Sequence, residues 1–258
     1  MTLGVSLTDF VSFGHHLADM ARPVARQYFR KSLDVEIKSD SSPVTKADRE
    51  IEALLRAEIA AVYPGHGMFG EEQGGNFDCA YTWVVDPIDG TKSFVTGVPM
   101  FGTLISLLYE QRPVLGIIDM PALGERWSGA GGQAWFGEEP ARTSARGLQE
   151  ARLFATSPDQ FEGKDAEAFA TMRRHVGLTR FGLDCYAYGL LASGHVDLIV
   201  EAGLQVYDVM ALVPVVEGAG GVITDWQGAA LSPGFDGRVV AAANSGLHAA
   251  ALQLLQEG

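Results

Sequence analysis

The chain has 258 residues, 47% hydrophobic and 20% charged, which suits a compact soluble enzyme with one large core or two fused lobes. A formal net charge of −13 without a cluster of lysine or arginine argues against nucleic acid as a partner, and no apolar run approaches the roughly 18 residues of a membrane span. Cys79 and Cys185 form no disulfide framework and residues 1–13 lack the features of a signal peptide, so we expect a cytoplasmic protein with reduced thiols.

The N-terminal half is predicted to combine two helices with a meander of strands. Apolar residues at helical spacing predict a helix over residues 7–28 with a kink near Pro23, and a second helix that opens at Thr45 and ends at Pro64-Gly65. The strand over 83–85 is expected to stop at Asp86-Pro87, and a hairpin is expected to turn at 110–113. The expected strands are residues 35–38, 83–85, 101–109, 114–119, 125–130 and 133–136.

The C-terminal half alternates between strands and helices. The expected strands are residues 152–156, 195–201, 221–225 and 238–242, and the expected helices are residues 165–176, 186–192 and 209–217. This rhythm predicts an α/β half that follows an α+β half. Pro140, Ser144 and Gly147 cluster near the change of rhythm, so we place the boundary between an N-terminal lobe (1–145) and a C-terminal lobe (146–258) there.

The segment from Trp83 to Thr91 concentrates the residues most suited to chemistry. An apolar strand delivers Asp86 and Asp89, two carboxylates three residues apart, into a loop. Gly90 allows the backbone to approach a ligand closely, and its amide with that of Thr91 could bind phosphate oxygens. Magnesium prefers oxygen ligands, typically one or two carboxylates with a substrate phosphate. An Asp-Pro turn followed by an Asp-Gly turn explains the same residues about equally well when they are taken alone.

Three other acidic positions have a structural explanation as well as a functional one. Glu71-Glu72 lies in a glycine-rich loop and is compatible with a solvated acidic turn. Asp208 lies where the N-cap of an apolar helix belongs, and Asp48 follows Thr45 at the spacing of a capping box. The six histidines lack the spacing of zinc ligands, and neither cysteine has an obvious histidine partner.

Taken together, these motifs resemble the inositol monophosphatase family, which includes fructose-bisphosphatase-like enzymes. The resemblance rests on Gly70-Glu71-Glu72, on Trp83 to Thr91, and on Glu201 to Asp208 followed by Glu217-Gly218-Ala219-Gly220-Gly221. The motifs occur in order and cover essentially the whole chain. The resemblance implies an α/β fold, a layered αβαβα sandwich, and a metal-dependent phosphomonoesterase that acts on a small phosphorylated substrate.

The resemblance also implies that the protein binds two or three Mg²⁺ ions, for which Mn²⁺ could substitute. It further implies roles for single residues. Glu71, Asp86 and the backbone oxygen of Ile88 would bind the first metal, with Asp86 bridging to a second metal bound by Asp89 and Asp208. Glu72 would assist a third, weaker metal or the local hydrogen-bond network. Thr91 and Asp48 would orient the attacking water, which Glu71 helps to activate. Lys38 would be a basic position near the site, and Asp89, Gly90, Thr91 and Asp208 would also contact the substrate.

The histidinol-phosphatase branch of the family resembles this chain most. That resemblance rests on Gly90 to Phe94, Pro99 to Ile105, Asp184 to Tyr188 and Val200 to Leu204. Lys92 stands where inositol-directed members usually have asparagine. Asp184 and Glu201 are two further acids, which would suit the ammonium group of histidinol. Asp184 could instead form a structural ion pair with Arg180, and Leu183 is bulkier than the branch usually has.

We therefore expect an L-histidinol-phosphate phosphatase of histidine biosynthesis. The alternatives are an inositol-1-phosphate or broad-specificity sugar and polyol phosphatase of the same fold, and a non-catalytic protein that binds phosphorylated ligands. The full set of carboxylates together with Thr91 argues against the non-catalytic alternative. The family resemblance further implies a homodimer and inhibition by Li⁺.

Overall fold

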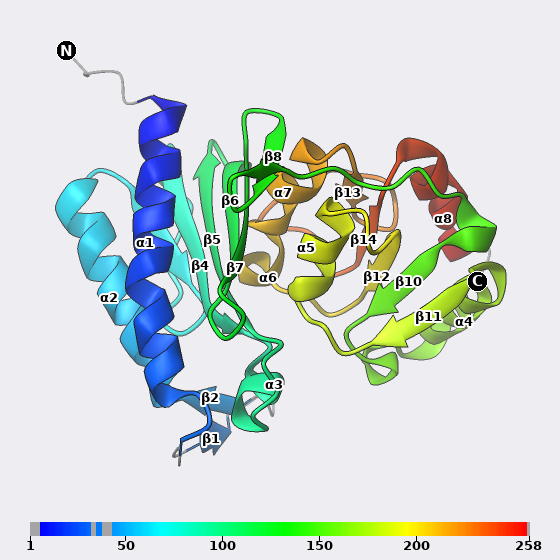
Figure 1. Ribbon diagram of the computed structural model, residues 1–258. Helices are drawn as coiled ribbons and strands as arrows, with labels where there is room; N and C mark the ends of the chain where they lie inside the picture. Colours follow the sequence, from blue (N-terminus) through cyan, green and yellow to red (C-terminus); the bar gives the residue numbers. More distant parts are fainter. Residues whose placement is uncertain (1–5, 32–34, 38–42, 257–258) are drawn as a thin grey trace.

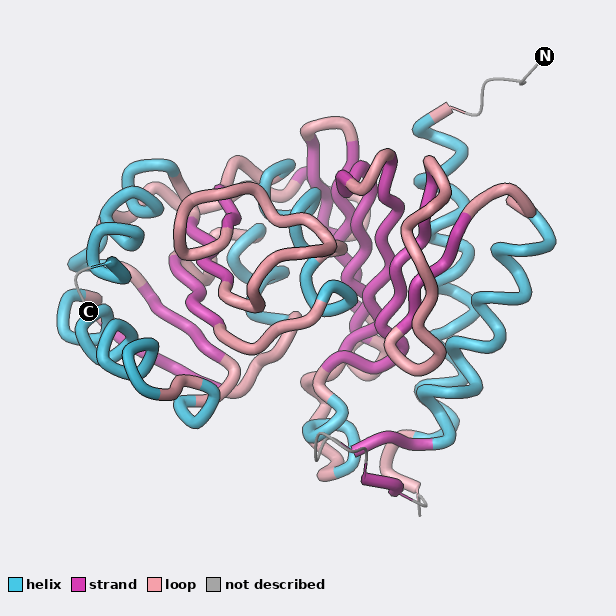
Figure 2. Tube along the Cα trace, turned by 180° about the vertical axis from the view of Figure 1, so that it is seen from behind, coloured by secondary structure: helices cyan, strands magenta, loops and turns pink. Residues whose placement is uncertain are grey.

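The helices and strands of the protein stack in five layers, in the order helix, sheet, helix, sheet, helix (Figure 1). The computed structural model describes residues 6–31, 35–37 and 43–256. Lys38, one of the expected site residues, lies outside these ranges. The layered α/β sandwich expected from the resemblance is confirmed, and Figure 2 shows the same stack from behind, with helices at both outer sides.

Two long helices form the first layer and cover one face of the larger sheet. These helices are α1 (Leu7–Tyr28) and α2 (Lys46–Val62). A capping box opens each of them, between Ser6 and Asp9 in α1 and between Thr45 and Asp48 in α2. The first helix continues through Pro23 to its end. The buried faces of both helices pack against the sheet in one hydrophobic cluster, to which the sheet contributes Trp83, Ile105 and Ile117.

The second layer is a seven-stranded sheet in which the strands follow one another in chain order. The first pair is parallel, and the later pairs are antiparallel. The strands are β3 (Gly67–Gly70), β4 (Tyr81–Asp89), β5 (Gly102–Tyr109), β6 (Arg112–Met120), β7 (Glu125–Ala130), β8 (Gln133–Phe136) and β9 (Glu139–Pro140). A separate antiparallel pair, β1 (Val35–Ile37) and β2 (Pro43–Thr45), precedes α2.

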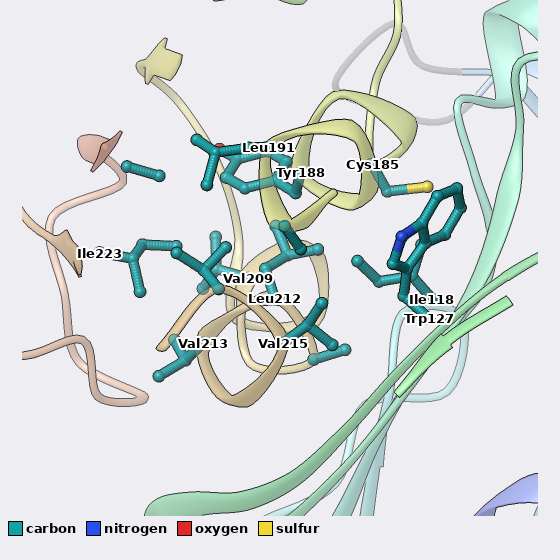
Figure 3. Packing of buried hydrophobic residues seen from close by; sticks show 14 of the residues in the cluster. Ile118, Trp127, Cys185, Tyr188, Leu191, Val209, Leu212, Val213, Val215 and Ile223 are labelled. Carbon is teal, nitrogen blue, oxygen red and sulfur yellow. The ribbon is translucent and has the colours of Figure 1, made fainter. Parts of the chain in front are cut away.

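Short helices fill the middle layer between the two sheets. They are α5 (Tyr186–Ala192), α6 (Val206–Val209) and α7 (Leu212–Gly218). Their apolar side chains form one buried cluster with residues of both sheets. Members of this cluster that are labelled in Figure 3 include Ile118, Trp127, Cys185, Tyr188, Val209, Leu212 and Ile223.

The middle layer touches the larger sheet through glycines. A Cβ atom at Gly116 of β6 would overlap the carbonyl oxygen of Ala211, and one at Gly129 of β7 would overlap that of Pro214. The backbone of α7 and of the residue before it therefore lies directly against the sheet, closer than a side chain at either position would allow.

The fourth and fifth layers are a five-stranded sheet and two outer helices. The strand order is β11-β10-β12-β14-β13, with parallel pairs around β10 and antiparallel pairs around β14. The bounds are β10 (Arg152–Ala155), β11 (Leu178–Phe181), β12 (Leu198–Glu201), β13 (Val222–Thr224), β14 (Val239–Ala242), α4 (Gly163–His175) and α8 (Ser245–Gln256). Two 3₁₀ turns, Leu148–Glu150 and Pro158–Gln160, flank β10.

Several expected boundaries differ from the structure. The central hairpin turns at Glu110-Gln111 rather than over 110–113, because both residues adopt left-handed backbone geometry (φ 48° and 63°), which completes a two-residue turn. The helix expected over 209–217 is two helices, α6 and α7, that meet near Ala211. The chain changes sheets between β9 and β10, an interval that contains residue 145, while the division into two lobes stays a prediction.

None of the helices in the described ranges combines the length and the apolar character that crossing a membrane requires. Both cysteines are free thiols, and Cys185 is buried in the middle layer. Its sulfur lies 3.9 Å from that of Met120 on β6.

Candidate active site

The end of β4 presents two of the expected carboxylates. The strand does not stop at Asp86-Pro87 as expected but continues to Asp89, because a shift of register between Asp86 and Asp89 accommodates the proline. Within this bulge, the Ile88 amide donates to Asp86 Oδ1 at 3.0 Å, and the Thr103 hydroxyl donates to the Pro87 carbonyl at 2.8 Å. These bonds hold the bulge in one shape and so fix the position of Asp86.

The chain turns sharply after β4 and starts a short helix, α3 (Thr91–Val95). Gly90 provides the turn in the left-handed region (φ 82°), which glycine adopts without strain. The Thr91 hydroxyl donates to the carbonyl of Ile88 at 3.0 Å. Thr91 and the Ile88 carbonyl, both expected site groups, therefore lie in contact.

Asp208 reaches the same place from the C-terminal half of the chain. The sequence predicts an N-cap at this position, but the N-cap of α6 is Gln205, and Asp208 is the third residue of the helix. From there it accepts the Gln205 amide at 2.6 Å, as part of a capping box. One carboxylate oxygen each from Asp86, Asp89 and Asp208 lies within 4.8 Å of the others.

A second acidic cluster joins Asp48 with Glu71 and Glu72, and one carboxylate oxygen from each of them lies within 4.8 Å of the others. Asp48 is buried on α2, where its Oδ2 accepts the amide and the hydroxyl of Thr45 at 2.9 and 2.6 Å. In the part of the chain that the structure describes, no hydrogen bond joins Asp48 to Thr91. The expected pairing of these two residues around a water molecule stays a prediction.

Burial and like charge raise the pKa values of these acids. Burial is the main cause for Asp86, Asp89 and Asp208, and neighbouring negative charges add to it, above all Glu71 for Asp86 and Asp89 for Asp208. For Asp48, burial raises the pKa to about 6. Carboxylates crowded in this way would be stabilised by a bound multivalent cation.

Asp184 and Cys185 join the site from the loop before α5. The amide of Cys185 donates to Asp89 Oδ2 at 2.7 Å, and Ser93 of α3 donates to Asp184 Oδ2 at 3.2 Å. Burial, then the charge of Asp89, raises the pKa of Asp184 to about 7. Among the described residues, Asp184 and Arg180 do not form the ion pair that was the structural alternative.

Glu201 ends β12 deep in the molecule. The amide and hydroxyl of Thr156 both donate to its Oε1 at 3.0 Å, and the Gln160 side chain donates to its Oε2. Burial raises the pKa of Glu201 to about 8. Donors from the protein thus already engage both of its oxygens. The expected contact of Glu201 with substrate stays a prediction.

Sequence reasoning missed the hydroxyl groups that support these acids. Ser93 donates to Asp184, and Thr156 donates to Glu201. Thr103 donates to the backbone inside the bulge of β4. Nothing local in the sequence marks these three donors, because each of them acts on a segment far along the chain.

Sequence reasoning also missed Glu52, although this residue left a signal that could have been read. It lies four residues after Asp48 and next to Ile51, on the face of α2 that is buried. An acid on the apolar face of a predicted helix indicates a specific partner.

The sequence pattern of the inositol monophosphatase family matches residues 6–258. The chain belongs to the inositol monophosphatase family. A solved structure of an inositol monophosphatase from Zymomonas mobilis superposes with a TM-score of 0.90 at 44% identity, and the match covers 98% of this chain and 100% of that one.

Two curated relatives carry different names. The bifunctional phosphatase IMPL2 (chloroplastic) of Arabidopsis thaliana is 46% identical, with 97% of this chain and 76% of the relative covered. A histidinol-phosphatase of Chlorobaculum parvum is 36% identical, with 86% of this chain and 88% of the relative covered. These matches identify a phosphatase of the inositol monophosphatase family and leave the substrate open.

Members of the inositol monophosphatase family are metal-dependent, typically with Mg²⁺. The donor set fits such an ion, because both clusters offer carboxylate oxygens, which hard cations prefer. Within the described ranges, no lysine or arginine forms an ion pair with Asp86, Asp89 or Asp208. Bound cations would therefore neutralise the negative charge of this cluster.

Proposed function

We propose that this protein is a magnesium-dependent phosphomonoesterase whose preferred substrate is L-histidinol phosphate. The observation that supports the chemistry is the convergence of Asp86, Asp89 and Asp208 from two distant segments, beside a turn that opens a helix. Asp184 lies next to the same turn and supports the choice of substrate.

Glu71, Asp86, Asp89, Asp208 and the Ile88 carbonyl would hold the metal ions. Bound Mg²⁺ neutralises the negative charge of the phosphate and lowers the pKa of a bound water molecule. The amides of Gly90 and Thr91, at the start of α3, would bind the phosphate oxygens.

Water would attack phosphorus in line with the leaving alcohol, without a phosphoenzyme. The bond between phosphorus and the alcohol oxygen breaks as the bond to water forms, and the leaving oxygen takes a proton from solvent to give the free alcohol. Thr91 and Asp48 would take up the proton of the water. Burial raises the pKa of Asp48 to about 6 in the metal-free protein, which makes its carboxylate a stronger base than an exposed aspartate.

Asp184 would bind the ammonium group of histidinol. Its carboxylate accepts a hydrogen bond from Ser93 of α3 and lies close to Gly90, so the leaving group of a phosphate ester bound at Gly90 would meet it. A cationic group there would favour the ionised form of Asp184, whose pKa is otherwise raised to about 7. The histidinol-phosphatase of Chlorobaculum parvum among the relatives also supports this substrate.

Inositol-1-phosphate is the competing substrate, favoured by the similarity to the inositol monophosphatase of Zymomonas mobilis. A panel of histidinol phosphate, inositol-1-phosphate and fructose-1,6-bisphosphate separates the candidates. We expect phosphate release that requires Mg²⁺, stops with a chelator, and has its highest kcat/KM on histidinol phosphate. A higher kcat/KM on either of the other esters would refute histidinol phosphate as the preferred substrate. No phosphate release from any of the three esters would refute the proposal that the protein is a phosphatase.

Replacing Asp184 should affect one substrate selectively. Because a hydrogen bond to a charged group contributes about 1.5–3 kcal/mol, Asp184→Ala should raise KM for histidinol phosphate roughly 10- to 100-fold. The KM for inositol-1-phosphate, which carries no cation, should change much less. Asp184→Asn keeps the shape and removes the charge, so it should behave like Asp184→Ala. Equal effects on the KM of both esters would contradict the proposed contact between Asp184 and the ammonium group.

A cytoplasmic location, a homodimer and inhibition by Li⁺ remain expectations from the family resemblance. Gel filtration with light scattering tests the dimer. Titration of the magnesium-supported activity with Li⁺ tests the inhibition.

A further inference from the structure

A fully buried glutamate, Glu52, lies on the inward face of α2 one helical turn after Asp48. Its Oε2 accepts the amide of Glu72 at 2.7 Å, and its Oε1 accepts the amide of Gln73 at 3.0 Å. Burying a carboxylate is costly unless hydrogen bonds satisfy it. Here two of the donors are backbone amides of the loop that carries Glu71 and Glu72.

Arg56, one turn further along α2, ties the same loop at its other end. Its Nη2 donates to Glu52 Oε1 at 2.8 Å and to the carbonyl of Gly74 at 3.0 Å. Gly70 and Gly74 close the loop with two mutual backbone hydrogen bonds of 3.1 and 2.9 Å. The loop is therefore joined to itself at its ends and to Glu52 at its middle.

Gly70 shows how closely the loop approaches this carboxylate. A Cβ atom at Gly70 would overlap the carboxyl group of Glu52. The carboxyl group of Glu52 therefore occupies the space that a side chain at position 70, the end of β3, would fill.

We propose that Glu52, with its charge balanced by Arg56, is a positioning residue that sets where Glu71 and Glu72 lie relative to Asp48. Asp48 and Glu52 are four residues apart on one helix, roughly 6 Å along its axis. Asp48 belongs to the acidic cluster, and Glu52 holds the backbone of the loop that carries the rest of it. The helix therefore fixes the spacing within that cluster. The inference rests on the proposed metal-dependent function of the site.

Glu52→Gln tests this role with the shape of the side chain kept. The NH₂ group of glutamine would face a backbone N–H donor, so either Glu72 or Gln73 loses its acceptor, and Arg56 loses its counter-charge. Partners that orient metal ligands typically contribute about 10- to 100-fold in affinity, so Mg²⁺ or Mn²⁺ titrated alone should bind more weakly by that factor. Hydrogen exchange at the amides of Glu72 and Gln73 should become faster, and kcat at fixed Mg²⁺ should fall more than KM changes.

Two controls separate positioning from stability. Ile59→Val removes a buried methyl group from the same helix, and Glu58→Gln neutralises an acid of α2 that contacts His16 instead of the loop. Both should keep wild-type metal affinity, even where Ile59→Val lowers the melting temperature as much as Glu52→Gln. If Glu52→Gln does not fold, Glu52→Asp provides the test, because it keeps the charge that Arg56 balances and draws the carboxylate back by one methylene from the amides of Glu72 and Gln73.

The outcomes distinguish the positioning role of Glu52 from the proposed metal-dependent phosphatase activity on which it rests. Wild-type protein without metal-dependent phosphate release would overturn both. An active wild type together with a Glu52→Gln variant that matches it in metal affinity, amide exchange and kcat would overturn the positioning role alone.

Discussion

Asp89→Asn should abolish turnover while the protein stays folded. The side chain is proposed to bind the second metal, and losing several kcal/mol of transition-state stabilisation corresponds to roughly a 10³-fold or greater fall in kcat/KM. The fold should persist, because an asparagine carbonyl can still accept the Cys185 amide that Asp89 accepts at 2.7 Å. The melting temperature of the metal-free variant should equal or exceed that of wild type, since one of several crowded like charges is gone.

Steady-state kinetics, metal titration and thermal unfolding of the same preparation check this expectation. Asp165→Asn is the matched control, because it makes the same chemical change at an acid of α4 that pairs with Arg238, away from both acidic clusters. It should leave kcat/KM unchanged. Wild-type turnover in Asp89→Asn would exclude this carboxylate as a metal ligand.

The largest effect on stability should come from Asp197, which lies outside the site. Its fully buried carboxylate accepts the amide of Arg152 at 2.9 Å, the guanidinium of Arg152 at 2.7 and 2.9 Å, and the hydroxyl of Ser144. It thereby joins the start of β10 to the segment that links the two sheets. Asp197→Ala leaves these donors without an acceptor and should lower the free energy of unfolding by about 3 kcal/mol or more, measured with urea at neutral pH.

The same contact predicts how stability depends on pH. Burial alone would raise the pKa of Asp197, but the hydrogen bonds from Arg152 and Ser144 outweigh it and lower this pKa from 3.8 to about 2. A carboxyl with a depressed pKa stabilises the fold above its unfolded-state pKa and loses that contribution as pH falls through the folded-state pKa. The difference in unfolding free energy between wild type and Asp197→Ala should therefore be constant down to about pH 4 and shrink below it.

Asp236→Ala is the control for this variant, because it removes an exposed carboxylate that pairs with the partly exposed Arg238. Its effect on the free energy of unfolding should stay within about 0.5 kcal/mol. A loss at Asp197→Ala as small as that, or a difference from wild type that grows toward low pH, would contradict the assignment.

Local patterns in the sequence predict those parts of the site that depend on neighbours along the chain. Asp86 and Asp89 follow an apolar run at a spacing of three residues, which places both carboxylates at the same end of one strand. The predicted position of Asp208 is wrong by three residues, because Gln205 takes the cap and Asp208 reciprocates from the third residue of the helix. A capping box and an N-cap aspartate look alike until the first helical residue is known.

The remaining features depend on contacts between segments far apart in the chain. Periodicity places Glu52 on the buried face of α2, but it does not identify the partner, which is the backbone amide of Glu72 twenty residues away. The sequence predicts Glu201 as a substrate contact, and its partner Thr156 follows a different strand. Such pairs carry no signal at a fixed spacing, so a single sequence does not reveal them.

The glycines beneath α7 have a consequence for how the two halves of the chain cooperate. Asp208 belongs to α6, and the junction that follows it lies on Gly116, with the next turn lying on Gly129. A methyl group at either glycine would overlap this backbone, so we expect Gly116→Ala or Gly129→Ala to shift the short helix that carries Asp208. If Asp208 binds metal as proposed, such a shift would slow the reaction, although neither glycine belongs to an acidic cluster.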